Sequence, residues 1–502
     1  MFAPEGRPIY LILLFTVLSF VTNFQDSYSN SYVNTAYDGF QDYFNQSYIN
    51  RSNAHGLSKW AWTWIWSVFL NIWSIGMMFG IFITPYLSDH YGRKTALIVS
   101  AIISIFGTGL AVVAIILKIP ELVLIARTIA SSSCGVSFTT LYVFIQEVSP
   151  TSLRGTYSFL VQNTYMFINV IGFALGWDLI LGKHVDILTG VGLIPGALAL
   201  LIMFPLKETP KFLLIHKNNR LAAIKSLKFY QGEEINVNEI LEIIQKEAKD
   251  EKLNLPFRKA LLETIRVPYL RNALLIGIMA FNLINPVWTI LYLSSILLEA
   301  NFTDDVSEYI SFGYIVAQFL AGLGGAFVAD SFGRRPLLLI SATINTLTIV
   351  SYILFNRLAF YFGGLYKYGC VGSLIAYGIT YGIALGPICF FISAELTPQQ
   401  YRSLIQSIVI AVNTVISLII TFLSLPAYNW IDIWSFIPLF VLPSIISIVY
   451  IAYVMPETRG REIYQIIEEL KGSKSKTSSM NTNYTKISEN SNSDKEINFE
   501  RL

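Results

Sequence analysis

One short charged turn occurs twice in this sequence, each time between two long apolar runs. The two copies are Asp89–Lys94 and Asp330–Arg335. Two further pairs of charged segments repeat in the same order and at nearly the same separation: Glu147–Arg154 with Glu395–Arg402, and Lys207–Pro210 with Pro456–Arg459. A single match could arise by chance, but three in one order indicate a duplicated chain whose halves fold alike.

Composition places both halves in a membrane. The 502 residues are 54% hydrophobic and only 14% charged, whereas soluble domains carry roughly 25% charged residues. A net charge of +2 gives no reason to expect a nucleic-acid partner. The four histidines and the cysteines Cys134, Cys370 and Cys389 lack ligand spacing, so we expect no metal and no cofactor. The sequence contains no pairing of a nucleophile with a base that would indicate an enzyme.

Twelve apolar runs are long enough to cross a bilayer as helices, which takes about 20 residues each. They lie at 9–30, 64–88, 95–117, 121–147, 156–182, 186–206, 271–299, 308–330, 336–356, 369–396, 403–427 and 432–455. Together with the duplication, they predict an all-α membrane protein of twelve transmembrane helices in two six-helix bundles. The expected domains are 1–206 (N-terminal bundle), 207–270 (cytoplasmic helical linker), 271–456 (C-terminal bundle) and 457–502 (cytoplasmic helix and disordered tail).

Charges and sequons predict the orientation in the membrane. Arginines gather in short loops on one side, which the positive-inside rule makes cytoplasmic. They are Arg93, Arg154, Arg334, Arg335 and Arg402. Sequons on the other side begin at Asn45, Asn50 and Asn301, where we expect glycans. A fourth sequon, at Asn483, falls in the cytoplasmic tail and is not expected to be glycosylated. Both termini are therefore expected in the cytoplasm, and run 9–24 is expected to remain as an uncleaved first span.

The polar interval between the halves predicts helices on the cytoplasmic face. One runs from Leu221 to Tyr230 and ends near Gly232. Another begins at Asn236, whose side chain caps it while Glu239 reaches back. Residues 472–502 are rich in serine, asparagine and lysine and are expected to be disordered.

The repeated charges have two interpretations. The simpler one is that they anchor the topology at the membrane margin. The other is a latch, because acids and bases at adjoining helix ends can bond to each other and to helix termini. Bonds that form in one conformation only would bias an equilibrium between two states. The charged residues of the repeated turns that fit this latch are Asp89, Lys94, Glu208, Asp330 and Glu457.

The repeated segments also resemble a known family. Asp89–Lys94, Glu147–Gly155, Lys207–Leu214 and Pro456–Arg461 are similar to the signature set of the sugar-porter family. This is the branch of the major facilitator superfamily that contains the animal facilitative glucose transporters. The resemblance covers about residues 9–470 and implies two bundles that rock about a central site, with a latch that closes the cytoplasmic side when the site faces outward.

The resemblance also implies which residues form the latch. They are Arg93, Glu147, Arg154, Arg334, Arg335, Glu395 and Arg402. Arg127, inside the fourth run, matches a family arginine that is expected to join them, with Glu147 or the Asp89 turn as its partner.

A sugar site built from amides within the spans is implied by the same resemblance. Gln162 matches a family sugar-binding glutamine, and Gln318 and Asn413 match further amide positions. In span seven only Asn282 and Asn285 could replace the usual amides. Each of these amides could instead form an interhelical hydrogen bond.

Three positions in the expected site depart from the family pattern. Phe390 stands where the family commonly has tryptophan, and Gly382 stands where it has an acid. Pro286 is expected to unwind or kink span seven. These changes make glucose itself a doubtful substrate.

Energy coupling depends on the polar half of span one. Proton-coupled relatives place an acid where this chain has Ser29, and Asp26 lies one turn earlier as the candidate proton site. The alternative is that Asp26 pairs locally near the outer mouth. Gln25 and Tyr28 match family positions and are expected to line the outer cavity.

Three functions are consistent with these residues. The first is facilitative uniport of a hexose or similar small polar solute by alternating access, in the plasma membrane. Asp26 and the missing span-seven glutamines support a proton-coupled sugar or organic-solute symporter instead. A sugar sensor that does not transport is the third, with thin support from a tail this short. The expected partners are the solute and the lipid bilayer.

Overall fold

The computed structural model describes residues 8–52, 56–150, 154–177, 179–233, 236–249, 257–299, 301–459, 461 and 463–471, and every regular element in them is a helix. Eleven helical segments are long and apolar enough to cross a membrane. The remaining predicted span, the eighth, corresponds to α14 (Asp304–Phe332), in which Tyr309–Gly325 forms a shorter apolar segment. The predicted all-helical membrane fold is confirmed, while the predicted tail at 472–502 lies outside the described residues.

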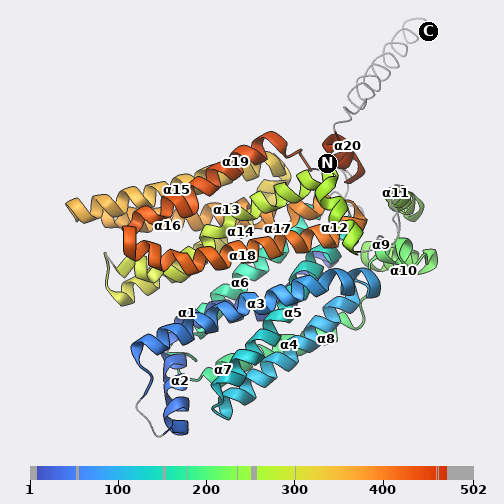
Figure 1. Cartoon of the computed structure of the whole chain (residues 1–502). Helices are drawn as coiled ribbons and strands as arrows, with labels where there is room; N and C mark the ends of the chain where they lie inside the picture. Colours follow the sequence, from blue (N-terminus) through green and yellow to red (C-terminus); the bar gives the residue numbers. More distant parts are fainter. Residues whose placement is uncertain are drawn as a thin grey trace, which may run out of the picture.

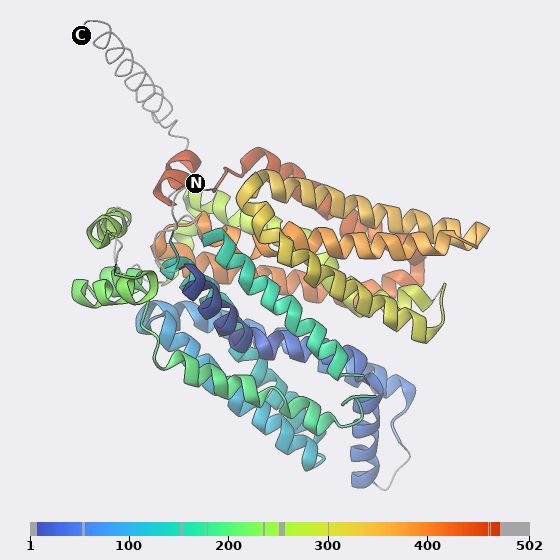
Figure 2. The same ribbon diagram turned by 180° about the vertical axis from the view of Figure 1, so that it is seen from behind.

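The spans form two groups of roughly parallel helices that lie side by side (Figures 1 and 2). The first group is α1 (Pro8–Thr35), α3 (Lys59–Tyr91), α4 (Arg93–Ile116), α5 (Pro120–Val148), α6 (Arg154–Leu175), α7 (Val185–Gly190) and α8 (Leu193–Met203). The second is α13 (Pro268–Glu299), α14, α15 (Arg334–Phe362), α16 (Tyr366–Thr380), α17 (Gly386–Glu395), α18 (Gln399–Ile431) and α19 (Leu442–Val454). Where the groups meet, α6 packs against α14 and α3 packs against α18. The domain limits at 206, 270 and 456 remain a proposal.

The tenth span is interrupted by a π-helical turn, η2 (Tyr381–Leu385), between α16 and α17. Pro387 lies two residues after this turn and has no N–H to continue the ladder of helical hydrogen bonds, which favours such a turn. Glycine lets this span approach α14 closely, because a Cβ at Gly382 would lie 2.2 Å from the carbonyl oxygen of Gln318. The twelfth span likewise begins with two short irregular turns, η3 (Asp432–Ser435) and η4 (Ile437–Val441), before α19.

Of the two outcomes predicted for Pro286, unwinding of span seven does not occur, and a kink stays a prediction. α13 continues through Pro286 as an α-helix over its whole length. Within a packed helical bundle, neighbouring side chains can satisfy the backbone groups that a proline frees, so the helix need not open.

Four shorter helices lie together at one end of the bundles: α9 (Pro210–Ile215), α10 (Arg220–Gln231), α11 (Val237–Lys249) and α12 (Phe257–Arg266) (Figure 1). α20 (Ile463–Leu470) lies at the same end. The two predicted linker helices are confirmed, since Gly232 ends α10 with φ of 102° and Asn236 and Glu239 exchange side-chain bonds at the start of α11. At the opposite end, α2 (Tyr37–Ser52) packs its aromatic side chains against the start of α3.

Candidate solute site and charged gate

The two copies of the charged turn have the same geometry. Gly92 and Gly333 have φ of 104° and 91°, a region that favours glycine. Each ends one helix and starts the next, which leaves N–H groups without partners. Glu208 accepts from the N–H groups of Arg93 and Lys94 at 3.0 and 3.1 Å. In the second copy Glu457 accepts from those of Arg334 and Arg335 at 2.9 and 3.2 Å.

The second base of each turn caps the sixth span of its own bundle. Lys94 Nζ donates to the carbonyl groups of Phe204 and Leu206, at 2.8 and 2.6 Å, where α8 ends. Arg335 donates to the carbonyl of Ala452 near the end of α19, at 2.6 Å. Since helix C-termini carry partial negative charge, these bonds join the third and sixth spans of each bundle.

Arg93, the first base of the first turn, belongs to a cluster of charged side chains that also contains Asp89, Glu147 and Arg402. The Arg93 guanidinium lies 3.1 Å from Glu147 and 3.5 Å from Asp89. On the same Glu147 carboxylate, the Thr209 hydroxyl donates at 2.6 Å. Arg402, from the second bundle, lies 4.0 Å away. Glu147 therefore joins both bundles at the end that carries α9–α12.

The second half is described only in part. Arg334 and Glu395 are buried, as the latch prediction requires. The side chains of Arg154 and Asp330 lie outside the described part of the structure, so their predicted contacts are not placed.

Burial changes the acidity of two groups beside the cluster. It raises the pKa of Glu208, although the backbone N–H groups of Thr209 and Lys94 act against the rise. Burial and the nearby Arg93 guanidinium lower the pKa of His216, directly after α9, to about 4. A histidine beside the charge cluster therefore stays neutral near pH 7.

Arg127 does not join Glu147 or the Asp89 turn, so that prediction is wrong. Its guanidinium donates to the carbonyl groups of Phe69 and Ser29 and lies over the rings of Phe69 and Trp73. The physical reason is distance along α5: Arg127 and Glu147 are separated by more than five helical turns.

Asp26 is buried, and the positive charge of Arg127 lies close enough to attract its carboxylate. Its carboxylate accepts from Trp73 Nε1 at 2.8 Å and from Asn30 Nδ2 at 3.1 Å. The bond from Asn30 is the local pairing that the sequence suggested as an alternative. The bond from Trp73 on α3 shows, however, that Asp26 lies in the interior of the first bundle.

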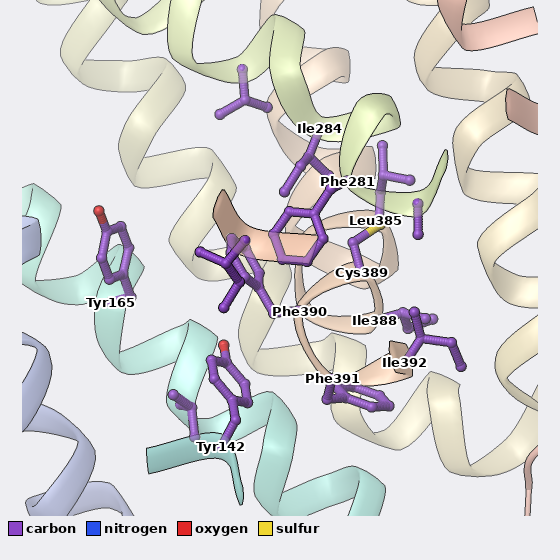
Figure 3. Packing of buried hydrophobic residues seen from close by; sticks show 14 of the residues in the cluster. Tyr142, Tyr165, Phe281, Ile284, Leu385, Ile388, Cys389, Phe390, Phe391 and Ile392 are labelled. Carbon is purple, nitrogen blue, oxygen red and sulfur yellow. The ribbon is translucent and has the colours of Figure 1, made fainter. Parts of the chain in front are cut away.

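At the centre of the molecule a polar group joins the two bundles. Gln162 on α6 is buried; its amide oxygen accepts from the Tyr142 hydroxyl at 3.3 Å and its nitrogen donates to the Tyr381 hydroxyl at 3.5 Å. Phe390 lies parallel to Tyr142, with ring centroids 6.1 Å apart, and edge-on to Phe281 (Figure 3). Amides and hydroxyls beside an aromatic wall are the groups that bind a small polar solute.

Three predicted solute ligands lie elsewhere. The Tyr28 hydroxyl donates to Leu188 O in α7, so Tyr28 is a core residue of the first bundle. Asn282 donates to Pro443 O and Ser447 Oγ on the twelfth span, which is the interhelical alternative. Gln25 donates to Ser29 and borders cavities inside the first bundle. In each case the face of the helix that carries the residue turns into its own bundle.

The remaining predicted amides stay candidates. The carbonyl oxygens of Asn285 and Asn413 are buried without a hydrogen-bond partner among the described residues, as expected of groups awaiting a ligand. Gln318 is buried on α14.

Sequence reasoning missed the tyrosines of the central region. Tyr142 and Tyr381 contact Gln162 directly, and the hydroxyls of Tyr314 and Tyr377 are buried without a partner among the described residues. A tyrosine inside an apolar span is a weak signal, but four of them on facing spans mark a polar centre.

Predicted glycan positions lie at the end opposite α9–α12 (Figure 1). Asn50 is exposed near the end of α2. Asn301 is half-buried in the turn between α13 and α14. Asn45 is half-buried and its side-chain oxygen accepts from Leu57 N at 2.8 Å.

Comparison with known proteins agrees with these features. The family model described as "Sugar (and other) transporter" matches residues 14–470. The chain is 26% identical over 483 residues to "Solute carrier family 2, facilitated glucose transporter member 5" of Rattus norvegicus, covering 92% of each chain. It is also 26% identical over 475 residues to member 14 of Homo sapiens, covering 92% of this chain and 88% of the relative.

Solved structures share the fold at lower identity. The proton:xylose symporter XylE bound to 6-bromo-6-deoxy-D-glucose matches with a TM-score of 0.75 at 17% identity, covering 91% of this chain and 98% of that one. FucP in the outward conformation matches with a TM-score of 0.56 at 16% identity, covering 88% and 98%. The chain therefore belongs to the sugar transporter family and has the major facilitator fold.

Proposed function

We propose that this sugar transporter is a facilitative uniporter of a hexose or a similar small polar solute, working by alternating access. The observation that carries the proposal is the Gln162 amide, held between Tyr142 of the first bundle and Tyr381 of the second. A solute that takes over these bonds would contact both bundles at once, so its binding would favour a state in which they approach. The relatives named above are facilitated glucose transporters, which supports uniport.

The gate at the α9–α12 end is part of this proposal. We place that end, and both termini, in the cytoplasm of a cell whose plasma membrane holds the protein. The ion pair between Glu147 and Arg402 joins the two bundles, so it would close the cytoplasmic side, and breaking it would open that side. The pair of Glu147 with Arg93 lies within the first bundle and would hold the carboxylate in place. The caps from Glu208 and Glu457 stay within one bundle each and would hold during the motion.

Uptake by proteoliposomes tests the proposal. Labelled glucose and fructose are offered to the purified protein with and without an imposed proton gradient. Saturable uptake that ignores the gradient is expected, and Gln162→Ala should raise KM while the protein stays folded. Asn345→Ala is the matched control, because it removes a buried amide that bonds to Tyr377 and Thr380 inside the second bundle and should leave KM unchanged. Solute binding without uptake would overturn transport in favour of a sensor.

Proton-coupled symport is the second candidate, and Asp26 favours it. A buried carboxylate beside Arg127 could alternate between pairing with the arginine and holding a proton. Uptake driven by the gradient and abolished by Asp26→Asn, with exchange of solute between the two sides retained, would establish this candidate and overturn uniport.

A further inference from the structure

Helix α12 is held at the margin of the membrane by its connection to a span. It ends at Arg266, and α13 begins at Pro268 with only Val267 between them. Figure 1 shows α12 at the end of the second bundle, turned across the direction of α13 and α18. A helix in this position lies along the membrane surface and cannot move far from it.

One face of α12 packs against the protein. Ala260 and Thr264 are buried. Between them in sequence, Glu263 accepts a hydrogen bond from the hydroxyl of Tyr401, a buried residue in the first turn of α18. This bond fixes which face of α12 turns outward.

The opposite face combines apolar and basic side chains. Leu262 and Ile265 are 45% and 54% exposed. Arg258, Lys259 and Arg266 are exposed around them. Residues 258, 262, 265 and 266 share one helical face by their spacing. The only acid in α12 is Glu263, which is bonded to Tyr401 on the other side.

A helix with large aliphatic side chains beside several bases lies in the interface of a bilayer with its apolar face at the acyl boundary. Bases near the surface are attracted by anionic headgroups. We propose that α12 is an interfacial helix that binds anionic lipid headgroups through Arg258, Lys259 and Arg266 and places Leu262 and Ile265 at the acyl boundary.

The lipid contact of α12 also affects the gate. Tyr401 is the neighbour of Arg402, which lies 4.0 Å from Glu147. Lipid bound to α12 therefore steadies the start of α18 in the position where the gate is closed. This consequence rests on the proposed function, whereas the lipid contact itself does not.

A fluorescent probe at Ile265 tests the lipid contact. The three native cysteines are buried, so Ile265→Cys offers the accessible thiol for an environment-sensitive label. The full-length protein is placed in vesicles of phosphatidylcholine alone or mixed with phosphatidylserine. A blue-shifted emission that brominated acyl chains quench is expected, stronger with phosphatidylserine. The matched control is Leu221→Cys, an exposed leucine on α10, whose label should stay in water. Equal emission from the two labels would overturn the proposal.

Charge variants separate headgroup binding from burial. Replacing Arg258, Lys259 and Arg266 by glutamine should lower the affinity for phosphatidylserine about fivefold for each base removed. Retention of the full phosphatidylserine effect would overturn the role of the bases. Tyr401→Phe should leave the probe quenched but remove the effect of phosphatidylserine on transport rate. If the effect on transport persists, the link to the gate is wrong while the lipid contact stands.

Discussion

The carboxylate of Glu147 lies 4.0 Å from the guanidinium of Arg402, and these two residues belong to different bundles. Arg93 contacts the same carboxylate from within the first bundle, at 3.1 Å. All three side chains are almost fully buried. One carboxylate thus contacts two cations in a place that is shielded from water, and separating the bundles would remove it from Arg402.

Glu147→Gln should therefore open the gate. Removing one partner of a buried charge pair costs about 3–5 kcal/mol, and the cost falls on the closed state. A cysteine at Gln146, whose amide donates to Phe391 O across the bundles, reports opening by its reaction with a membrane-impermeant reagent. We expect faster labelling in the variant.

The control for this experiment is an exposed pair in the same chain. Arg51 and Glu121 are bonded at 2.7 Å, with side chains about half exposed. Exposed pairs contribute about 0–1 kcal/mol, so Glu121→Gln should not change labelling at Gln146→Cys. Equal labelling of Gln146→Cys with and without Glu147→Gln would show that Glu147 does not close the gate.

Gly92→Ala should destabilise the protein through two effects. With φ of 104° and ψ of 162°, Gly92 lies in a region that costs an alanine about 1–3 kcal/mol. The new Cβ would also lie 2.3 Å from the Glu208 carboxylate that caps α4. We expect a lower melting temperature in detergent and, since the cap is displaced, weaker closure of the gate.

Gly363→Ala separates strain from the clash. Gly363 also has positive φ, 59°, but nothing lies within 4 Å of its Cβ position. Its replacement should lower the melting temperature by less than Gly92→Ala. If both substitutions had the same effect, the contact with Glu208 would contribute nothing.

His216 predicts a pH dependence of stability. Its pKa is about 4 in the folded protein, against about 6.5 when unfolded. A histidine with a lowered pKa binds protons more readily when unfolded, so its contribution to stability falls as the pH drops from 6.5 towards 4. Glu208 acts in the opposite sense, because burial raises its pKa and its contribution is largest at low pH.

The measurement is the difference between the wild-type protein and His216→Gln, which leaves the Glu208 contribution common to both. The melting temperature of the wild-type protein should fall more steeply between pH 6.5 and 4. Parallel curves for the two proteins would contradict the lowered pKa of the half-buried His216.

Sequence patterns predicted the membrane spans and the linker helices, because bilayer thickness and helix caps act locally. It was harder to predict which side chains of each span face the centre between the two bundles. Tyr28 and Asn282 have the right chemistry for a solute site, yet both bond within their own bundle. Arg127 was assigned to the wrong end of α5, since its partners come from α1 and α3 and no local signal identifies them.

Gly382 illustrates a further limit. The resemblance places an acid at this position, and the glycine looked like a lost ligand. Instead, the backbone of α14 occupies the space, 2.2 Å from where a Cβ would be. We therefore expect that Gly382→Glu will not restore a solute contact and will lower the melting temperature by displacing α14.

Gly372→Glu is the control for that substitution, since no atom lies within 4 Å of the Cβ position of Gly372 on the same span. It should be better tolerated than Gly382→Glu. Improved solute binding by folded Gly382→Glu would refute the packing explanation.

Tyr381→Phe tests the solute site most directly. The Tyr381 hydroxyl accepts from Gln162 across the bundles, so its loss removes one bond that the solute is expected to share. A neutral hydrogen bond contributes about 1 kcal/mol, and KM should rise about fivefold while the fold is kept. Tyr352→Phe is the matched control, because its hydroxyl donates to Leu297 O inside the second bundle. An equal rise in KM for both variants would mean that the loss of any buried hydroxyl perturbs transport, and Tyr381 would then have no special role at the solute.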